Sequence, residues 1–194
     1  MEVYIVRHGE TVWNAAGKLQ GQTDIELNEK GRELAGKLGE QLEQVHFDKI
    51  FASPLIRAYE TACLIRGHRN IPIIRDDRLK EISFGVEEGC DFRIWANPEC
   101  QYHPFFTAPQ DYVPPQDGEG FEDVKARTKE FLLEVIEPLA KDHERIMIVA
   151  HGALNKGLMS YIEKNDLPNY WGQGLQKNCE ADVFVFDGSC WARK

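Results

Sequence analysis

The chain has 194 residues, of which 42% are hydrophobic, and this is enough for one globular domain with a sizeable core. We therefore expect a single domain over residues 1–194. The formal net charge of −9 repels nucleic acid and anionic membranes at long range, so we expect neither as a partner. A site for an anionic ligand would have to be built from local positive charge.

The sequence also indicates the cellular location and the redox state of the cysteines. We find no pattern typical of a secretory signal and no apolar run that approaches bilayer length, so we expect a cytoplasmic protein. The five cysteines are odd in number and lack CxxC spacing, which favours reduced thiols over a disulfide framework or a zinc site. The oligomeric state stays open.

Five short β-branched runs predict strands, and helical patterns alternate with them. The runs cover residues 2–6, 49–52, 71–75, 145–150 and 182–187. Strands that alternate with helices are typical of an α/β fold. We therefore expect a mostly parallel central sheet with helices on both faces.

Four helices are predicted between these strands. An apolar stripe at helical spacing predicts a helix that begins near Asn28. Ser53 is a suitable N-cap for the second helix, and Pro54 suits the first helical position because its missing N–H is not needed there. The third helix should cover residues 119–138, and the fourth should follow His151.

One segment, 91–117, departs from this alternation. It holds five of the nine prolines and six aromatic residues. We interpret it as an inserted cap or lid. Its aromatic side chains could pack as a small satellite core or contact a substrate, and the sequence favours packing. The six are Phe92, Trp95, Tyr102, Phe105, Phe106 and Tyr112.

Two predicted strands end in the same dipeptide, His-Gly. His8 follows the first strand and Arg7, and His151 follows the strand at 145–150. Because ligands of parallel sheets bind where the carboxyl ends of the strands converge, we expect these histidines to meet. A neutral imidazole can attack phosphorus if cationic donors neutralise the phosphoryl oxygens, and arginine suits that role best. Arg57 should lie in the first turn of the second helix, which also favours an anion.

Five sequence blocks resemble the histidine phosphatase superfamily, which includes cofactor-dependent phosphoglycerate mutases and their phosphatase relatives. In order they are RHGETVWN (7–14), GKLQGQTDIELNEKG (17–31), SPLIRAYETA (53–62), LKEISFGVEEG (79–89) and VAHGALN (149–155). The likeness spans nearly the whole chain. The FGVEEG stretch is most similar to small phosphatases of the superfamily, such as alpha-ribazole and broad-specificity phosphatases.

The resemblance implies a role for each matching residue. His8 would be phosphorylated in turnover, while Arg7, Arg57 and His151 would hold the transferring phosphoryl group. Glu81 would protonate the leaving oxygen and then accept a proton from the attacking water, without a metal or another cofactor. The matching phosphate-pocket positions are Asn14, Gln20, Gly21 and Gly152, although Asn14 and Gln20 could instead stabilise turns.

We expect hydrolysis of a small phosphorylated metabolite. The main alternative is a phosphoglycerate mutase-type phosphotransferase. The chain is short for a mutase, ISFGVEEG replaces the arginine and tyrosine that follow the mutase acid, and segment 91–117 lacks the mutase arginine pair. A second alternative is a non-catalytic phosphate-binding regulatory domain, which is disfavoured because no expected nucleophile, acid or second histidine is missing.

Overall fold

A computed structural model describes all residues, 1–194, and confirms the predicted α/β alternation. Six strands form one sheet in the order β3-β2-β4-β1-β5-β6. The first four of these run parallel, whereas β5 is antiparallel to β1 and β6 is antiparallel to β5. The sheet is therefore mixed but mostly parallel. The strands are β1 (Glu2–Arg7), β2 (Lys49–Ala52), β3 (Ile73–Arg75), β4 (Arg145–Ala150), β5 (Ala181–Phe186) and β6 (Trp191–Arg193).

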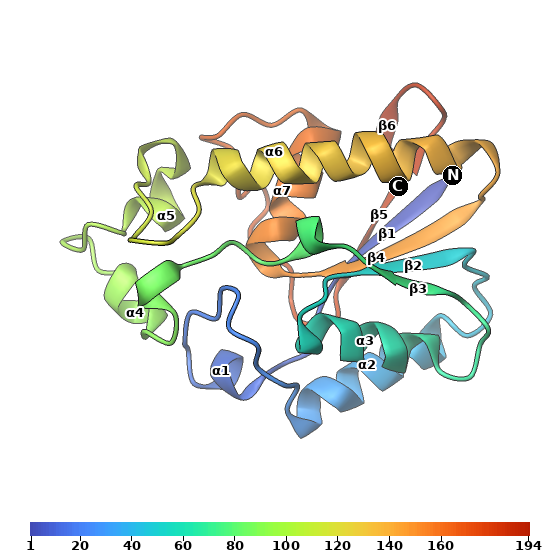
Figure 1. Cartoon of the computed structure of the whole chain (residues 1–194), viewed down its shortest axis with the longest axis horizontal. Coiled ribbons are helices and arrows are strands. Elements are labelled where there is room, and N and C mark those ends of the chain that lie inside the picture. Colours follow the sequence, from blue (N-terminus) through green and yellow to red (C-terminus); the bar gives the residue numbers. More distant parts are fainter.

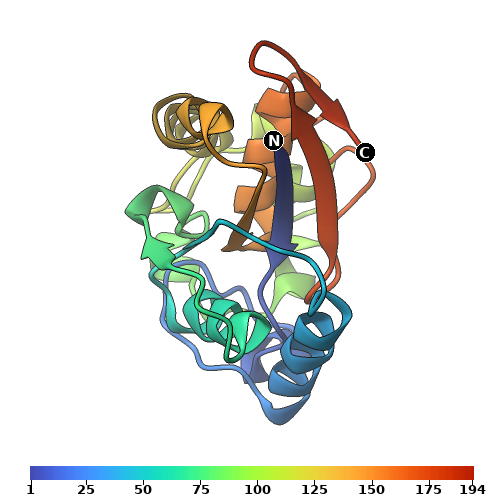
Figure 2. The same ribbon diagram turned by 90° about the vertical axis from the view of Figure 1, so that its right-hand side faces the viewer.

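Helices cover both faces of the sheet, as predicted. Figures 1 and 2 show α6 (Phe121–Phe131) and α7 (Gly152–Glu163) on one face and α2 (Glu29–Gln41) and α3 (Ile56–Arg66) on the other. Each face has its own core, with 25 buried residues under α6 and α7 and 10 under α2 and α3. The central strands are buried on both faces, which explains their continuous apolar runs.

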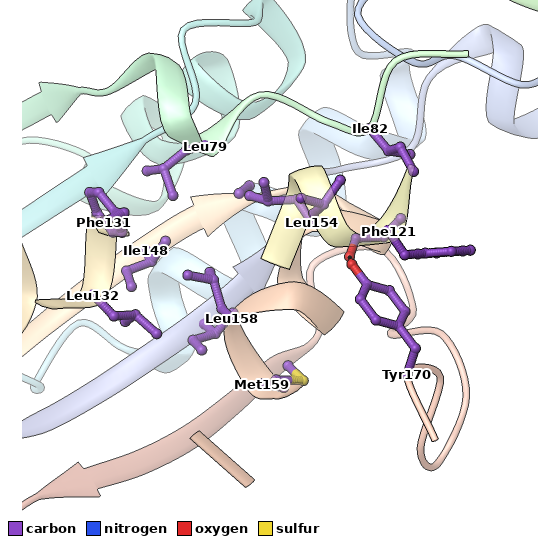
Figure 3. Close-up of a cluster of buried hydrophobic side chains, with 14 of the residues drawn as sticks. Leu79, Ile82, Phe121, Phe131, Leu132, Ile148, Leu154, Leu158, Met159 and Tyr170 are labelled. Carbon is purple, nitrogen blue, oxygen red and sulfur yellow. Dashed lines mark hydrogen bonds between the residues drawn. The ribbon is translucent and has the colours of Figure 1, made fainter. Parts of the chain in front are cut away.

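Strand β4 shows how the two cores share one strand. Ile148 points into the larger core, where Figure 3 shows it near Phe131 of α6 and Leu158 of α7. Its neighbour Val149 belongs to the smaller core, because successive side chains of a strand point to opposite faces. Helices thus pack against both faces of the sheet, and this packing fixes the positions of the strand ends.

The remaining helical elements are short. Helix α6 continues through the π-helical turn η4 and the 3₁₀ helix η5, so the helical chain extends past Pro138 to Lys141. Pro138 lies in the first turn of η5, where its missing N–H is tolerated. No helix combines the length and apolar character that a membrane span needs. The short elements are α1 (Val12–Ala15), η1 (Asp77–Leu79), η2 (Gly85–Glu87), α4 (Phe92–Trp95), α5 (Pro104–Thr107), η3 (Pro109–Asp111), η4 (Leu132–Ile136) and η5 (Glu137–Lys141).

The predicted start of the second helix is wrong. Helix α3 begins at Ile56, so Pro54 lies outside it and Ser53 is not its N-cap. The first N–H of the helix instead donates to the Asp24 carboxylate, with 2.7 Å between Ile56 N and Asp24 Oδ1. A distant loop supplies this cap, and local sequence signals cannot reveal such a partner.

Segment 91–117 packs on the main core through part of its aromatic residues. Trp95, Phe105 and Tyr112 are buried members of the larger core. The packing interpretation is therefore confirmed for these three, although they extend the main core and do not form a separate satellite. The segment forms α4, α5 and η3, and its action as a lid stays a prediction.

Candidate active site

The carboxyl ends of β1, β4 and β2 lie side by side and carry the candidate catalytic residues. Two backbone hydrogen bonds extend the parallel ladder past the strand ends, from His8 N to Ala150 O (2.9 Å) and from Ser53 N to Val149 O (3.0 Å). The ring centres of His8 and His151 are 5.1 Å apart. The structure thus brings together the two histidines that lie 143 positions apart in sequence.

His8 is buried and has a defined neutral form. Its Nδ1 lies 2.7 Å from the carbonyl oxygen of Gly9. A carbonyl can only accept, so Nδ1 carries the hydrogen and Nε2 keeps its lone pair. Burial, followed by the charges of Arg57 and Arg7, lowers the pKa of His8 well below its usual value of 6.5. The unprotonated Nε2 required of a nucleophile is therefore favoured.

His151 is fully buried beside His8. Its Nε2 lies 2.8 Å from the hydroxyl oxygen of Ser53, while its Nδ1 has no hydrogen-bond partner. Burial, followed by the charges of Arg57 and His8, lowers the pKa of His151 well below 6.5. A serine that donates to Nε2 fixes the tautomer with an N–H on Nδ1. That N–H then has no acceptor within the protein.

Arg57 is held from the loop that precedes α2. Its terminal nitrogens donate to the carbonyls of Gly21 (2.6 Å) and Thr23 (2.9 Å), and its buried Nε has no partner. Burial lowers the pKa of Arg57 to about 10, so the guanidinium still carries its charge at neutral pH. Gly21 adopts a left-handed backbone with φ of 54°, and an added Cβ would lie 2.1 Å from the carboxylate of Glu88. A side chain at Gly21 would therefore strain the backbone and displace the Glu88 carboxylate.

Arg7 is positioned by the segment that leads into β5. One terminal nitrogen donates to the carbonyl of Gln176 at 2.5 Å, and its buried Nε has no partner. Gln176 is itself fixed, since its side-chain amide donates to the carbonyl of Ile5 (3.0 Å) and to the carboxylate of Asp182 (2.8 Å). Sequence reasoning missed Gln176 because the stretch between α7 and β5 has no periodic pattern.

Glu81 reaches the same site from the loop after η1. Its carboxylate accepts the N–H groups of Leu154 (2.9 Å) and Ala153 (3.2 Å) in the first turn of α7, and that of Ile82 (3.0 Å). A helix N-terminus favours negative charge because its first N–H groups lack partners within the helix. Gly152, a predicted substrate-binding residue, is the first residue of this helix.

Asn14 and Gln20 stabilise local structure and also face the pocket. Thr11 and Asn14 form a capping box at α1, in which each side-chain oxygen accepts the backbone N–H of the other residue. The carbonyl oxygen of Gln20 accepts the Thr11 hydroxyl at 2.8 Å. The turn-stabilising interpretation is therefore confirmed for these oxygens. Both residues line the pocket, and no hydrogen bond within the protein uses their amide nitrogens.

A pocket of about 580 Å³ joins these groups. Arg7, His8, Arg57 and Glu81 line it, whereas His151 is not among its lining residues. Eight of its 21 lining residues are apolar. Segment 91–117 supplies Phe92, Phe105 and Phe106, and the others are Leu19, Phe84, Ala153, Trp171 and Leu175. Outside Arg7 and Arg57, Lys18 is the one lysine or arginine that lines the pocket.

Asn178 is a further residue that sequence reasoning missed. It lines the pocket, and its amide donates to the carbonyl of His8 at 2.9 Å. It therefore holds the turn that presents His8. No group of three or more histidine, cysteine, aspartate or glutamate side chains is placed to hold a metal ion.

Comparison with known proteins points to one family over nearly the whole chain. The family model described as histidine phosphatase superfamily (branch 1) matches residues 3–194. Phosphoserine phosphatase 1 of Hydrogenobacter thermophilus is 31% identical over 187 residues, which cover 90% of this chain and 82% of that protein. A 2,3-bisphosphoglycerate-dependent phosphoglycerate mutase of Cytophaga hutchinsonii is 34% identical over 163 residues, with 82% and 76% covered. The solved structure of Bacillus stearothermophilus YhfR has a TM-score of 0.90 at 35% identity, with 99% and 94% covered.

Proposed function

The chain belongs to the histidine phosphatase superfamily, and from this we propose that it hydrolyses small phosphate monoesters through a phosphohistidine on His8. The observation that carries the proposal is the meeting of two imidazoles and two guanidiniums at one site. Three buried nitrogens of that site lack partners, namely Arg7 Nε, Arg57 Nε and His151 Nδ1. Because unpaired buried donors are costly, their concentration here favours an anionic ligand such as a phosphoryl group.

In the first step, the Nε2 lone pair of His8 attacks phosphorus and the ester P–O bond breaks. Glu81 donates a proton to the leaving oxygen. Positive charge develops on the imidazole of His8, and the Gly9 carbonyl that accepts its Nδ1–H stabilises that charge. Arg7 and Arg57 neutralise the phosphoryl oxygens.

In the second step, water attacks the phosphorus of the phosphohistidine and the P–N bond breaks. The Glu81 carboxylate accepts the proton of this water, which restores the acid for the next turnover. His8 returns to its neutral form and inorganic phosphate leaves. Each cycle thus consumes one ester and one water and changes no other group of the protein.

Release of p-nitrophenol from p-nitrophenyl phosphate, with a metal chelator present, tests the proposal. We expect activity in the wild type and a loss by a factor on the order of 10³ or more in His8→Ala, because the nucleophile is removed. His68→Ala is the matched control, since His68 is exposed and should leave the rate unchanged. Equal rates for His8→Ala and the wild type would contradict the proposal.

The pocket wall favours water over a second substrate hydroxyl as the phosphoryl acceptor. The residues of segment 91–117 that line the pocket are Phe92, Phe105 and Phe106, and none of them can pair with a substrate carboxylate. We therefore prefer hydrolysis over the mutase reaction as the function of this site. The single-domain organisation over residues 1–194, the lid role of 91–117, metal independence and the cytoplasmic location remain parts of this proposal.

A further inference from the structure

The guanidinium of Arg127, in the middle of α6, uses all of its hydrogen-bond donors. Two of its N–H groups donate to the two carboxylate oxygens of Glu119, each at 3.0 Å. The others donate to the carbonyls of Arg78 (2.7 Å), Lys80 (2.6 Å) and Glu81 (3.1 Å). A guanidinium has five N–H groups. Three of them therefore hold the backbone of the segment that carries Glu81.

Glu119 holds the backbone that follows Glu81 in the chain. Oε2 of Glu119, which accepts one N–H of Arg127, also accepts the backbone N–H of Ser83 at 2.9 Å. The side-chain amide of Gln22 lies between the two, 3.3 Å from Glu119 and 3.1 Å from the carbonyl of Glu81. The backbone is thus fixed both before and after Glu81.

We infer that Arg127, together with Glu119, is a positioning residue that sets Glu81 for proton transfer; this rests on the proposed function of Glu81. The backbone of Glu81 is held by α6, while its carboxylate lies at the N-terminus of α7, next to His151. The two helices together fix where the carboxyl group stands relative to His8. Neither Arg127 nor Glu119 lines the pocket, so the effect acts through Glu81.

Arginine is needed at this position because three carbonyls at different points must be satisfied by one rigid, planar group. A lysine presents its three donors from one atom on a flexible chain and cannot reproduce the fork. The carbonyls it leaves unpaired would let the 78–83 backbone shift. Proton transfer requires the acid within hydrogen-bond distance of the leaving oxygen, and a misplacement of about 1 Å can lower a rate by about 100-fold.

The test compares two aryl esters of similar shape, p-nitrophenyl phosphate and phenyl phosphate, of which the second has the poorer leaving group and depends more on the acid. We expect R127K to lower kcat/KM for phenyl phosphate about 10-fold more than for p-nitrophenyl phosphate. R145K is the matched control. Arg145 pairs with Glu2 at the amino ends of β4 and β1, away from the site, so both esters should be affected alike.

E81Q is measured beside them as the reference for loss of the acid. If E81Q discriminates between the two esters and R127K does not, the positioning role is wrong and the proposed function stands. If E81Q itself affects both esters equally, the proposed acid role of Glu81 is wrong, and the inference falls with it. Thermal unfolding checks that each variant folds. If R127K does not fold, E119Q replaces it in the test, because it keeps the size of Glu119 and removes its charge. The loss in kcat/KM for phenyl phosphate relative to that for p-nitrophenyl phosphate is then compared in the same way.

Discussion

Burial and charge act in the same direction on the two imidazoles of the site. His8 and His151 are both enclosed, and the nearby Arg57 disfavours a proton on either ring, so the pKa of each lies well below 6.5. The arginines keep their charge, since even buried Arg57 retains a pKa of about 10. The site thus presents two neutral imidazoles among fixed cations.

This arrangement predicts how stability depends on pH. In the unfolded chain histidine takes up a proton near pH 6.5, whereas folded His8 and His151 take it up only at lower pH. The unfolded state therefore binds more protons below pH 6.5, and the free energy of unfolding falls by up to about 1.4 kcal/mol per pH unit for each histidine. Above pH 6.5 the two histidines are unprotonated in both states, so this loss of stability is absent.

Urea unfolding between about pH 5 and pH 7, in phosphate-free buffer, measures this dependence. His8→Gln should remove close to half of the slope attributed to the two buried histidines. His68→Gln, at an exposed position, should leave the slope unchanged. A slope in His8→Gln identical to that of the wild type would show that His8 is not held neutral by the fold.

At the scale of elements, the first turn of α2 packs directly against the turn that follows β1 and carries His8. An added Cβ at Gly31 would lie 2.1 Å from the carbonyl oxygen of Glu10, and one at Gly9 would lie 2.6 Å from the carbonyl oxygen of Gly31. The two backbones therefore touch beside His8. Gly36 of the same helix has nothing within 4 Å of an added Cβ.

We expect Gly31→Ala and Gly36→Ala to act in opposite directions. Gly31→Ala should lower the free energy of unfolding by about 1–3 kcal/mol through overpacking, and it should lower activity because the turn that carries His8 must move. Gly36→Ala should raise stability by about 0.5–1 kcal/mol, because alanine is the better helix former, and leave activity unchanged. Urea unfolding and p-nitrophenyl phosphate assays measure both. Loss of stability in both variants alike would contradict the backbone contact.

The helix itself was predictable, since it begins next to Asn28 as expected. The structure adds that the Asn28 side chain caps it by accepting the N–H of Gly31 at 2.7 Å. The close approach at Gly31 was not, because its partner turn lies about 20 positions earlier and leaves no mark on the local pattern. The convergence of His8 and His151 was predictable for a different reason. Parallel strands place their carboxyl ends at one edge, so strand order alone brought the two histidines together.

The contacts that could not be predicted from the sequence have a common physical cause. Each joins irregular backbone to a distant side chain. They are the Asp24 cap of α3, the bond from Arg7 to the Gln176 carbonyl and the bonds from Arg127 to the backbone around Glu81. Such contacts have no period, so neither hydrophobic spacing nor local capping signals indicate them. The short edge strand β6 (Trp191–Arg193) was missed because three residues are too few to show alternation.

At the scale of the whole molecule, a chain of net charge −9 carries a pocket that concentrates positive charge. Its lining combines the guanidiniums of Arg7 and Arg57 with aromatic rings of segment 91–117, namely Phe92, Phe105 and Phe106. The guanidiniums suit a phosphoryl group, and the rings offer a substrate carboxylate no positive charge. This lining predicts hydrolysis without transfer back to the substrate.

With 3-phosphoglycerate as the only substrate, we expect inorganic phosphate and glycerate, and no 2-phosphoglycerate above background. The reason is that no arginine of segment 91–117 lines the pocket to hold the substrate carboxylate while the phosphohistidine waits for a second hydroxyl. Phosphorus NMR of the reaction, with and without added 2,3-bisphosphoglycerate, measures both products. Isomerisation faster than phosphate release would overturn the preference for hydrolysis.

The covalent intermediate is the most direct test of the account. Wild type mixed briefly with p-nitrophenyl phosphate, quenched under alkaline conditions and analysed by mass spectrometry should carry one phosphoryl group, which peptide mapping assigns to His8. His8→Ala should carry none, while Glu81→Gln should still be labelled, because this activated leaving group departs with little need of the acid. A phosphoryl group on another residue, or active enzyme that never becomes labelled under rapid quenching, would contradict the assignment of His8 as the nucleophile.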